Sequence, residues 1–219
     1  MTAAPQKTLR PGQAHKRAAI LSAARDLFVH VGVERTSMDA VAAKAAVSKR
    51  TVYDYYGDKR RLLLAVIEEA GEAALDTLRR LLDEHLPEDI DSGASDDLER
   101  AVTAFASALG SSLLASADYA AAVTLISENE PLLPELEDHP LDAAHTQAVA
   151  VRLAAFADAG LLDVDDPQRA ADHFTALTTL RVLNEPLRRR SDPDRVRDIM
   201  TDGARVFLRA YAPLAERRS

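Results

Sequence analysis

Side chains able to bind nucleic acid are concentrated in one short part of the chain, from Ser37 to Lys59 (SMDAVAAKAAVSKRTVYDYYGDK). A short helix is expected to begin after Ser48, with polar residues on its outward positions. Those positions are Ser48, Lys49, Arg50, Thr51, Tyr53 and Tyr55. All six side chains can hydrogen-bond to base edges or phosphates, and none needs burial. The segment predicts a DNA contact; an ordinary helical hairpin with a solvated face is the alternative.

Apolar and small residues around this segment predict the two helices that would position it. The apolar set is Val41, Ala42, Ala45, Val47 and Val52. Ala46 lies between the two helices, where their backbones must approach closely over a tight turn. The second helix of such a pair is free to enter the major groove of DNA. We therefore expect a helix-turn-helix module here.

Charge is distributed very unevenly along the chain. The net charge is −8, which by itself argues against a nucleic-acid partner. Residues 1–61, however, carry 12 Lys and Arg against 5 Asp and Glu, a net charge of +7, while residues 62–219 carry 15 against 30, a net charge of −15. All five lysines (Lys7, Lys16, Lys44, Lys49 and Lys59) fall in the first part. This pattern predicts a polyanion-binding module on an acidic body; chance composition is the alternative.

Helix signals divide the first part of the chain. Residues 1–13 are polar and are expected to form a disordered arm. Apolar residues at helical spacing then run from Ile20 to Val31 and stop at Gly32. The segment Thr36-Ser37-Met38-Asp39 has the spacing of a capping box, with Asp in the place of Glu, and predicts a second helix to about residue 45. Ser48 should cap a third helix and Asp58 a long fourth one.

The remainder of the chain predicts an all-α bundle. Residues 87–95 are expected to form a loop, followed by helices at about 96–116, 118–129, 141–160, 167–188 and 193–212. No segment alternates with a period of two for long enough to suggest a sheet. We expect a three-helix DNA-binding domain at 14–61 and a regulatory and dimerisation domain at 62–219, about nine helices in all.

Several motifs in the first 62 residues resemble one family. They are Ile20-x-x-Ala23-Ala24-x-x-Leu27-Phe28, Gly32-Val33-x-x-Thr36-Ser37-Met38, Val41-Ala42, Ala45-Ala46-Val47-Ser48 and Thr51-Val52-Tyr53-x-Tyr55-Tyr56-x-x-Lys59-x-x-Leu62. Together they resemble the N-terminal domain of the TetR family of bacterial transcription regulators. The resemblance implies a chain of nine or ten helices, a homodimer, and repression that a small ligand relieves.

The same resemblance implies roles for individual side chains. Thr36 and Ser37 would open the second helix beside a phosphate. The segment from Ser48 to Thr51, including Lys49 and Arg50, would read bases or flanking phosphates. Tyr53 would touch a phosphate, Tyr55 would be a variable contact, and Lys59 would meet a phosphate at the start of the fourth helix.

The chain departs from the family pattern at two positions. Family members often have Gly where this chain has Ala46, and a positive φ there would cost about 1 kcal/mol with Ala. They also often have Gly where this chain has Arg50. The Arg50 guanidinium can donate two hydrogen bonds to one base, whereas glycine has no side chain. The operator sequence therefore cannot be inferred from relatives.

A possible ligand pocket is predicted in the second part of the chain. The stretch from Ile126 to Leu136, followed by Gly160-Leu161-Leu162, is similar to the AefR-like type of regulatory domain. The helix at 141–160 is apolar on more than one side, which places it inside a bundle. The candidate lining residues are Phe105, Leu109, Leu113, Ile126, Val149, Leu153, Phe156 and Phe174; the alternative is that they simply pack as core.

The wall of this pocket predicts the chemistry of its ligand. It contains no lysine, and its mid-helix cations are Arg152 and Arg181, although either could face solvent. An apolar wall with few polar groups selects a hydrophobic ligand of modest size. A strongly anionic ligand would need an unpaired buried cation, which is costly. We therefore expect a neutral or weakly polar hydrophobic effector.

Apolar stripes on the last two long helices predict a homodimer. The residues expected at the interface are Leu177, Leu180, Val196, Ile199 and Phe207. Two such helices from each subunit can form an isologous four-helix interface. Two DNA-binding domains would then reach half-sites of a palindromic double-stranded operator about 34 Å apart.

Other classes of protein find little support. Without cysteine there is no thiolate zinc site, and His139, His145 and His173 lack a metal-ligand spacing. No catalytic or cofactor-binding motif is present, so no cofactor is expected and an enzyme with a DNA-binding module is disfavoured. The uncharged stretch 101–117 is too short for a membrane span, and no signal-peptide core is seen, so a cytoplasmic location without membrane association is expected. A same-fold regulator that answers to a protein partner remains the main alternative.

Overall fold

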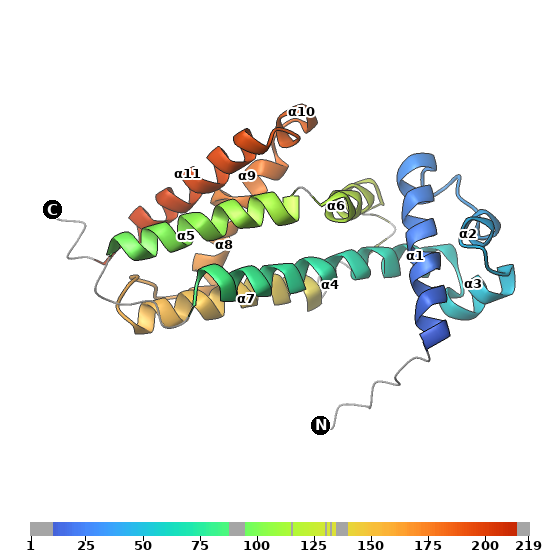
Figure 1. Ribbon diagram of the computed structural model, residues 1–219, viewed down its shortest axis with the longest axis horizontal. Helices are drawn as coiled ribbons and strands as arrows, with labels where there is room; N and C mark the ends of the chain where they lie inside the picture. The colour runs from blue at the N-terminus through green and yellow to red at the C-terminus, as the bar shows by residue number, and fades with distance from the viewer. Residues whose placement is uncertain are drawn as a thin grey trace, which may run out of the picture. The chain divides into compact units, whose positions relative to one another are not determined.

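The computed structural model describes residues 11–87, 95–114, 116–129, 131, 133–134 and 140–213 (Figure 1). In these ranges the helices are joined by turns and loops and no strand is present, which confirms the all-α prediction. The chain divides into two compact units. Unit 1 comprises Met1–Ala70 and Ala121–Pro134, and unit 2 comprises Gly71–Ala120 and Glu135–Ser219.

Unit 1 is built on three N-terminal helices. They are α1 (Pro11–Val31), α2 (Met38–Lys44) and α3 (Lys49–Tyr56), followed by the start of α4 (Lys59–His85), and α2 packs against both α1 and α3. The most deeply buried side chains of these helices include Ile20, Phe28, Val41, Val52 and Leu62. The expectation of a disordered arm to residue 13 is wrong at its end, because α1 already begins at Pro11. Proline suits the first turn of a helix, where its missing N–H is not needed. Residues 1–10 lie outside the described part.

The second helix is capped by a different residue from the predicted one. Ser37 is the N-cap of α2, and its Oγ accepts a hydrogen bond from the Ala40 N–H at 3.1 Å. Thr36 is buried instead, and its hydroxyl donates to the carbonyl oxygen of Gly32 at 2.8 Å. The capping-box register starting at Thr36 was therefore wrong by one residue.

Unit 2 contains the remaining helices. They are α5 (Ser95–Leu109), the π-helical turn η1 (Gly110–Leu114), α7 (Pro140–Asp158), α8 (Pro167–Leu177), α9 (Thr179–Leu183), α10 (Leu187–Arg190) and α11 (Pro193–Tyr211). The helix α6 (Ala117–Asn129) starts in unit 2 and continues into unit 1. α5 and α11 lie side by side, and α7 packs against α8 (Figure 1). Most of the predicted 87–95 loop, residues 88–94, lies outside the described part.

The helix predicted over residues 167–188 is broken at Thr178. The Thr178 backbone leaves the helical region, with φ −115° and ψ −88°. A Cβ added to Gly203 of α11 would overlap the carbonyl oxygen of Leu177, so the two backbones are in contact at this point. The Thr178 hydroxyl donates to the Phe174 carbonyl at 2.6 Å. This tertiary contact, which the helical periodicity of the sequence does not reveal, separates α8 from α9. The predicted helix also stops short of residue 188, because α9 ends at Leu183 and α10 begins only after Pro186.

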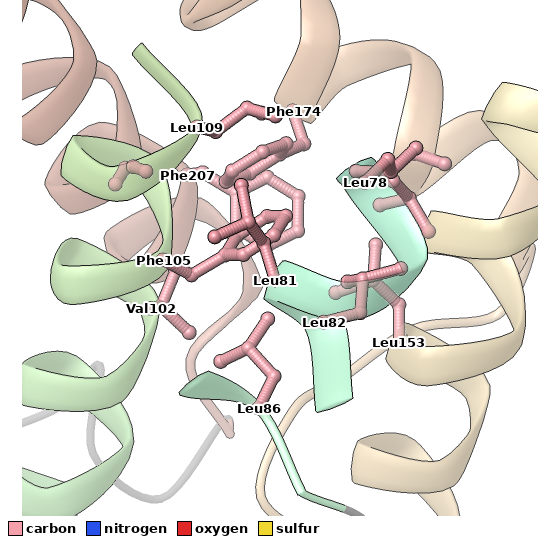
Figure 2. Packing of buried hydrophobic residues seen from close by; sticks show 14 of the residues in the cluster. Leu78, Leu81, Leu82, Leu86, Val102, Phe105, Leu109, Leu153, Phe174 and Phe207 are labelled. Carbon is pink, nitrogen blue, oxygen red and sulfur yellow. The ribbon is translucent and has the colours of Figure 1, made fainter. Parts of the chain in front are cut away.

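The core of unit 2 is centred on three aromatic rings from three helices (Figure 2). Phe174 of α8 lies 5.8 Å from Phe105 of α5 and 5.5 Å from Phe207 of α11, measured between ring centroids. The second pair meets edge to face at 89°, a favourable arrangement for aromatic rings. Leucines of α4 and α7 pack around them, including Leu78 and Leu153.

None of the described helices is by itself both long and apolar enough to cross a bilayer. The successive helices Asp97–Ser112 and Ala117–Asn129 would reach that length and composition only as a bent pair.

Candidate nucleic-acid interface

The N-terminus of α3 is closed by Ser48, as predicted. The Ser48 Oγ accepts a hydrogen bond from the Thr51 N–H at 3.1 Å, and the two hydroxyl oxygens of Ser48 and Thr51 lie 2.8 Å apart. A side-chain cap of this kind satisfies one of the amide groups that the first turn of a helix leaves unpaired. The cap positions the first turn of α3, which contains Lys49 and Arg50, on the exposed surface of unit 1.

Two apolar side chains anchor α3. Val52 is fully buried and Tyr56 nearly so. Burial raises the pKa of the Tyr56 phenol, and the neighbouring Arg17 guanidinium partly offsets this. With these two residues inward, Lys49, Arg50 and Tyr53 are exposed.

Lys49 is held by a carboxylate of the preceding helix. Its Nζ lies 2.8 Å from Oδ1 of Asp39 in α2 and donates a hydrogen bond to Oδ2 at 2.9 Å. The hydrogen bond and charge of Asp39 raise the pKa of the Lys49 ammonium. The same ammonium lies 5.8 Å from the centroid of the Tyr53 ring. The cation is therefore positioned across the turn between α2 and α3.

Arg50 forms a second ion pair within α3. Its Nε lies 3.6 Å from a carboxylate oxygen of Asp54, one helical turn further on, and 89% of its side chain is exposed. Tyr55 is half-buried, and its ring centroid lies 6.2 Å from that of Tyr56. The DNA-contacting residues predicted from the sequence did not include Asp39 or Asp54. The four-residue spacing of Arg50 and Asp54 was a signal for one of these pairs, but only the fold brings Asp39 to Lys49.

Two residues predicted to lie beside phosphate also make contacts that support the fold. Thr36 is 3% exposed and its hydroxyl donates to the backbone, so this side chain supports the loop before α2 in the free protein. The Lys59 ammonium donates to the carbonyl oxygens of Glu34 at 2.9 Å and Thr36 at 3.1 Å. Lys59 thereby fastens the loop before α2 to the start of α4. Ser37 is exposed and its oxygen caps α2.

The turn between α2 and α3 contains the departure from family pattern noted above. Ala46 has φ 53°, in the left-handed region that favours glycine. The Val47 N–H donates to the Ala42 carbonyl at 3.0 Å, and the Ala46 N–H to the Ala43 carbonyl at 3.2 Å. These bonds close the end of α2 in the manner of a left-handed C-cap. Ala46 therefore has the positive φ that the sequence analysis considered for this position.

The candidate pocket residues mostly form the core of unit 2. Phe105, Leu109, Val149, Leu153, Phe156 and Phe174 are all buried in one cluster. Ile126 belongs to the other unit and is 36% exposed. The side chain of Leu113 lies outside the described part of the structure.

The two arginines considered for ligand binding are engaged elsewhere. Arg152 is buried, and its guanidinium donates to the Leu86 carbonyl and to Asp83 Oδ1, the latter at 2.8 Å. Arg181 is exposed and pairs with Asp202 of α11 at 3.0 Å. Arg152 thus binds the C-terminal end of α4, and the expectation of two cations available to a ligand is not supported.

The predicted dimer residues fall into two groups. Val196, Ile199 and Phe207 are buried within the core of unit 2, so a stripe that includes them does not face a partner. Their burial against α5 and α8 could not be distinguished from interface packing by periodicity alone. Leu177 is half-buried, and Leu180 is 47% exposed.

A capped, exposed α3 beside α2 is the arrangement of the helix-turn-helix class of DNA-binding proteins. Residues 20–66 match the sequence family described as bacterial regulatory proteins, tetR family, and residues 100–213 match the AefR-like transcriptional repressor C-terminal domain. The chain belongs to the TetR family.

Individual relatives agree with this assignment. The HTH-type transcriptional repressor Rv3405c of Mycobacterium tuberculosis is 34% identical over 92 residues, which cover 38% of this chain and 49% of the relative. The chain therefore spans about half the length of the curated relatives it matches. A TetR-family regulator from Mesorhizobium loti has the same fold, with TM-score 0.77 and 23% identity over 93% of this chain and 100% of the other. The structure of the flavonoid-responsive regulator FrrA is similar as well, with TM-score 0.63 and 27% identity over 92% of this chain and 99% of FrrA.

Proposed function

We propose that this protein is a transcriptional repressor that binds a palindromic double-stranded DNA operator as a homodimer. The observation that carries the proposal is the exposed face of α3, where Lys49, Arg50 and Tyr53 project from a helix anchored by Val52. Arginine and lysine donate to guanine O6 and N7 in the major groove, and tyrosine donates to phosphate. In this proposal residues 14–61 bind DNA, and residues 62–219 bind the effector and the partner subunit.

Binding-site selection with the full-length protein tests this proposal. The protein should enrich a palindrome, and Arg50→Ala should relax base preference at one position of each half-site, at a cost of about 1–3 kcal/mol. Arg100→Ala is the matched control, because Arg100 is an exposed arginine of unit 2 that pairs with Asp97 at 2.6 Å. Equal affinity of the wild-type protein for selected and random DNA would rule the function out.

The proposed dimer uses exposed apolar side chains of α9 and α11. Leu180 is 47% exposed and Val206 is 38% exposed. Neither is needed in the core, and helices presenting such residues can pair isologously about a two-fold axis. Leu180→Glu should lower the sedimentation mass toward the 23.7 kDa of one chain while leaving helix content unchanged. A wild-type monomer that binds a palindrome with full affinity would contradict the dimer.

A small hydrophobic effector is proposed to release the operator. The rings of Phe105 and Phe174 lie within an apolar core, and such a lining selects apolar ligands. FrrA, by its name, responds to flavonoids, which are aromatic compounds. Because these side chains pack together here, a ligand would have to displace them and would favour a rearranged conformer. Operator release measured against a compound panel tests this; release by sugars or metal ions alone would contradict it.

A further inference from the structure

Two carboxylates, one from α2 and one from α3, lie beside the cations of the α3 surface. Asp39 of α2 binds Lys49 at 2.8 Å, and Asp54 binds Arg50 at 3.6 Å. Each cation proposed to approach the bases is therefore already paired with an acidic side chain in the absence of DNA. A carboxylate on this surface also repels phosphate, so its presence needs a functional account.

Both ion pairs are open to solvent. The side chains of Lys49 and Asp39 are 59% and 61% exposed, and those of Arg50 and Asp54 are 89% and 65% exposed. Exposed pairs of this kind contribute little to stability. They can therefore open when DNA arrives at a modest cost. The two ion pairs therefore influence which anion Lys49 and Arg50 bind, and they have little influence on the folding of α3.

We propose that Asp39 and Asp54 are specificity-determining residues that suppress binding of α3 to DNA of unrelated sequence. The inference rests on the proposed function, since it assumes that α3 enters the major groove. In random DNA, Lys49 or Arg50 gains a phosphate but loses its own carboxylate, which is left close to a polyanion. That exchange yields little net attraction.

A matching operator offers the carboxylates a partner that phosphate does not. Carboxylates accept hydrogen bonds from the N4 amino group of cytosine in the major groove, while arginine donates to the guanine of a G·C pair. The side chains of Arg50 and Asp54, one turn apart on α3, can both be satisfied by base edges. The penalty of opening the ion pairs is then offset only at the correct sequence.

The test compares Asp39→Asn and Asp54→Asn with the wild-type full-length protein. The probes are the palindrome obtained by selection and a random-sequence duplex, each titrated over a range of salt concentrations. Each variant should bind the random duplex about 2- to 5-fold more tightly, as expected for release of one exposed ion pair. Its log affinity should also fall more steeply with log salt, by up to about 0.9 for the freed cation. The ratio of operator to random affinity should drop.

A matched control separates this from a general effect of charge. Glu84→Gln also removes one negative charge from an exposed pair, with Arg80 at 3.2 Å one turn away on α4. It should leave the random-DNA affinity and the specificity ratio unchanged. In a Lys49→Gln background, Asp39→Asn should increase random-DNA binding clearly less than it does in the wild-type protein, because the cation it releases is absent and only the repulsion between the carboxylate and phosphate is relieved. Circular dichroism and thermal unfolding check that each variant folds.

The outcomes distinguish this inference from the proposed function. If the wild-type protein enriches no sequence, the function itself is wrong. If the wild-type protein enriches a palindrome but both Asn variants keep the wild-type random-DNA affinity, salt slope and specificity ratio, the role of Asp39 and Asp54 is overturned. The same conclusion follows if Glu84→Gln matches their effect, or if Asp39→Asn has an undiminished effect in the Lys49→Gln background.

Discussion

The ammonium group of Lys59, at the first residue of α4, donates a hydrogen bond to the carbonyl oxygen of Thr36 at 3.1 Å. A second bond to Glu34 at 2.9 Å makes this lysine a link between α4 and the loop before α2. The carbonyl groups it satisfies come from the loop that sets the start of α2.

Replacing Lys59 by methionine should destabilise the DNA-binding unit even without DNA. The variant keeps the aliphatic stem but loses both hydrogen bonds, at a cost of about 1 kcal/mol because the ammonium remains partly solvated. Urea unfolding of the free protein measures it. Lys44→Met is the control: Lys44 forms an exposed pair with Asp26 at 3.4 Å, so a smaller change is expected. Equal effects of the two variants would contradict the structural role of Lys59.

Ala46→Gly should stabilise the protein. Ala46 has φ 53°, a conformation that costs an L-residue about 1 kcal/mol and costs glycine almost nothing. Ala43→Gly, three residues earlier in the exposed part of α2, should destabilise by about 1 kcal/mol, since glycine is a poor helix former. Thermal unfolding of the two variants should thus shift in opposite directions. A loss of stability in both would show that the strain at Ala46 is negligible.

Gly203→Ala should be among the most damaging small substitutions in unit 2. The added methyl group would meet the backbone carbonyl of Leu177, which cannot move without separating α8 from α11. We expect a loss of about 3 kcal/mol. Gly110→Ala is the comparison, because its Cβ would lie 2.9 Å from Met200 Cγ, the flexible part of a side chain. Denaturant unfolding should show a clearly smaller loss for Gly110→Ala.

The ion pair of Arg152 with Asp83 should be asymmetric in its contribution. Arg152→Met leaves the Leu86 carbonyl without its buried donor, which should cost about 2 kcal/mol. Asp83→Asn removes only the charge of a side chain that is 76% exposed and should cost less than about 1 kcal/mol. Equal losses in chemical denaturation would mean that the charge pair, not the backbone contact, is the important interaction.

The start of α8 should lose stability in acid. The Arg169 N–H donates to the Asp166 carboxylate at 3.1 Å, and this bond is the main cause of the lowered pKa of Asp166. A lowered pKa means that the contribution is complete above the ordinary value of 3.8 and is lost as the pH falls through the folded value. Asp166→Asn keeps a capping oxygen but cannot titrate, so its unfolding free energy should fall less steeply below that pH. Identical acid profiles would refute this assignment.

Much of the candidate DNA interface could be predicted from the sequence because its signals are local. A serine cap, an apolar pair one turn apart and a run of outward polar residues all lie within a few residues of one another, so Ser48, Lys49 and Arg50 were correctly placed on the surface of a third helix. The starts of α8 and α11 also depend on local signals, because Asp166 and Asp192 cap helices whose first residue is proline, and the helix starts predicted at 167 and 193 were confirmed.

Only the tertiary structure decided the features that depend on distant residues. The contact of Gly203 with Leu177 divides a helix that is periodic in sequence, and the burial of Val196, Ile199 and Phe207 assigns an apolar stripe to the core instead of a partner. Helical periodicity reports that a face is buried, but not what covers it. The sequence by itself therefore determined the helix class, the Ser48 cap and the polar face of α3, all of which arise from interactions within one or two helical turns. The pairing of Lys49 with Asp39 depends on how α2 and α3 cross, so only the folded chain shows that its cation is already occupied.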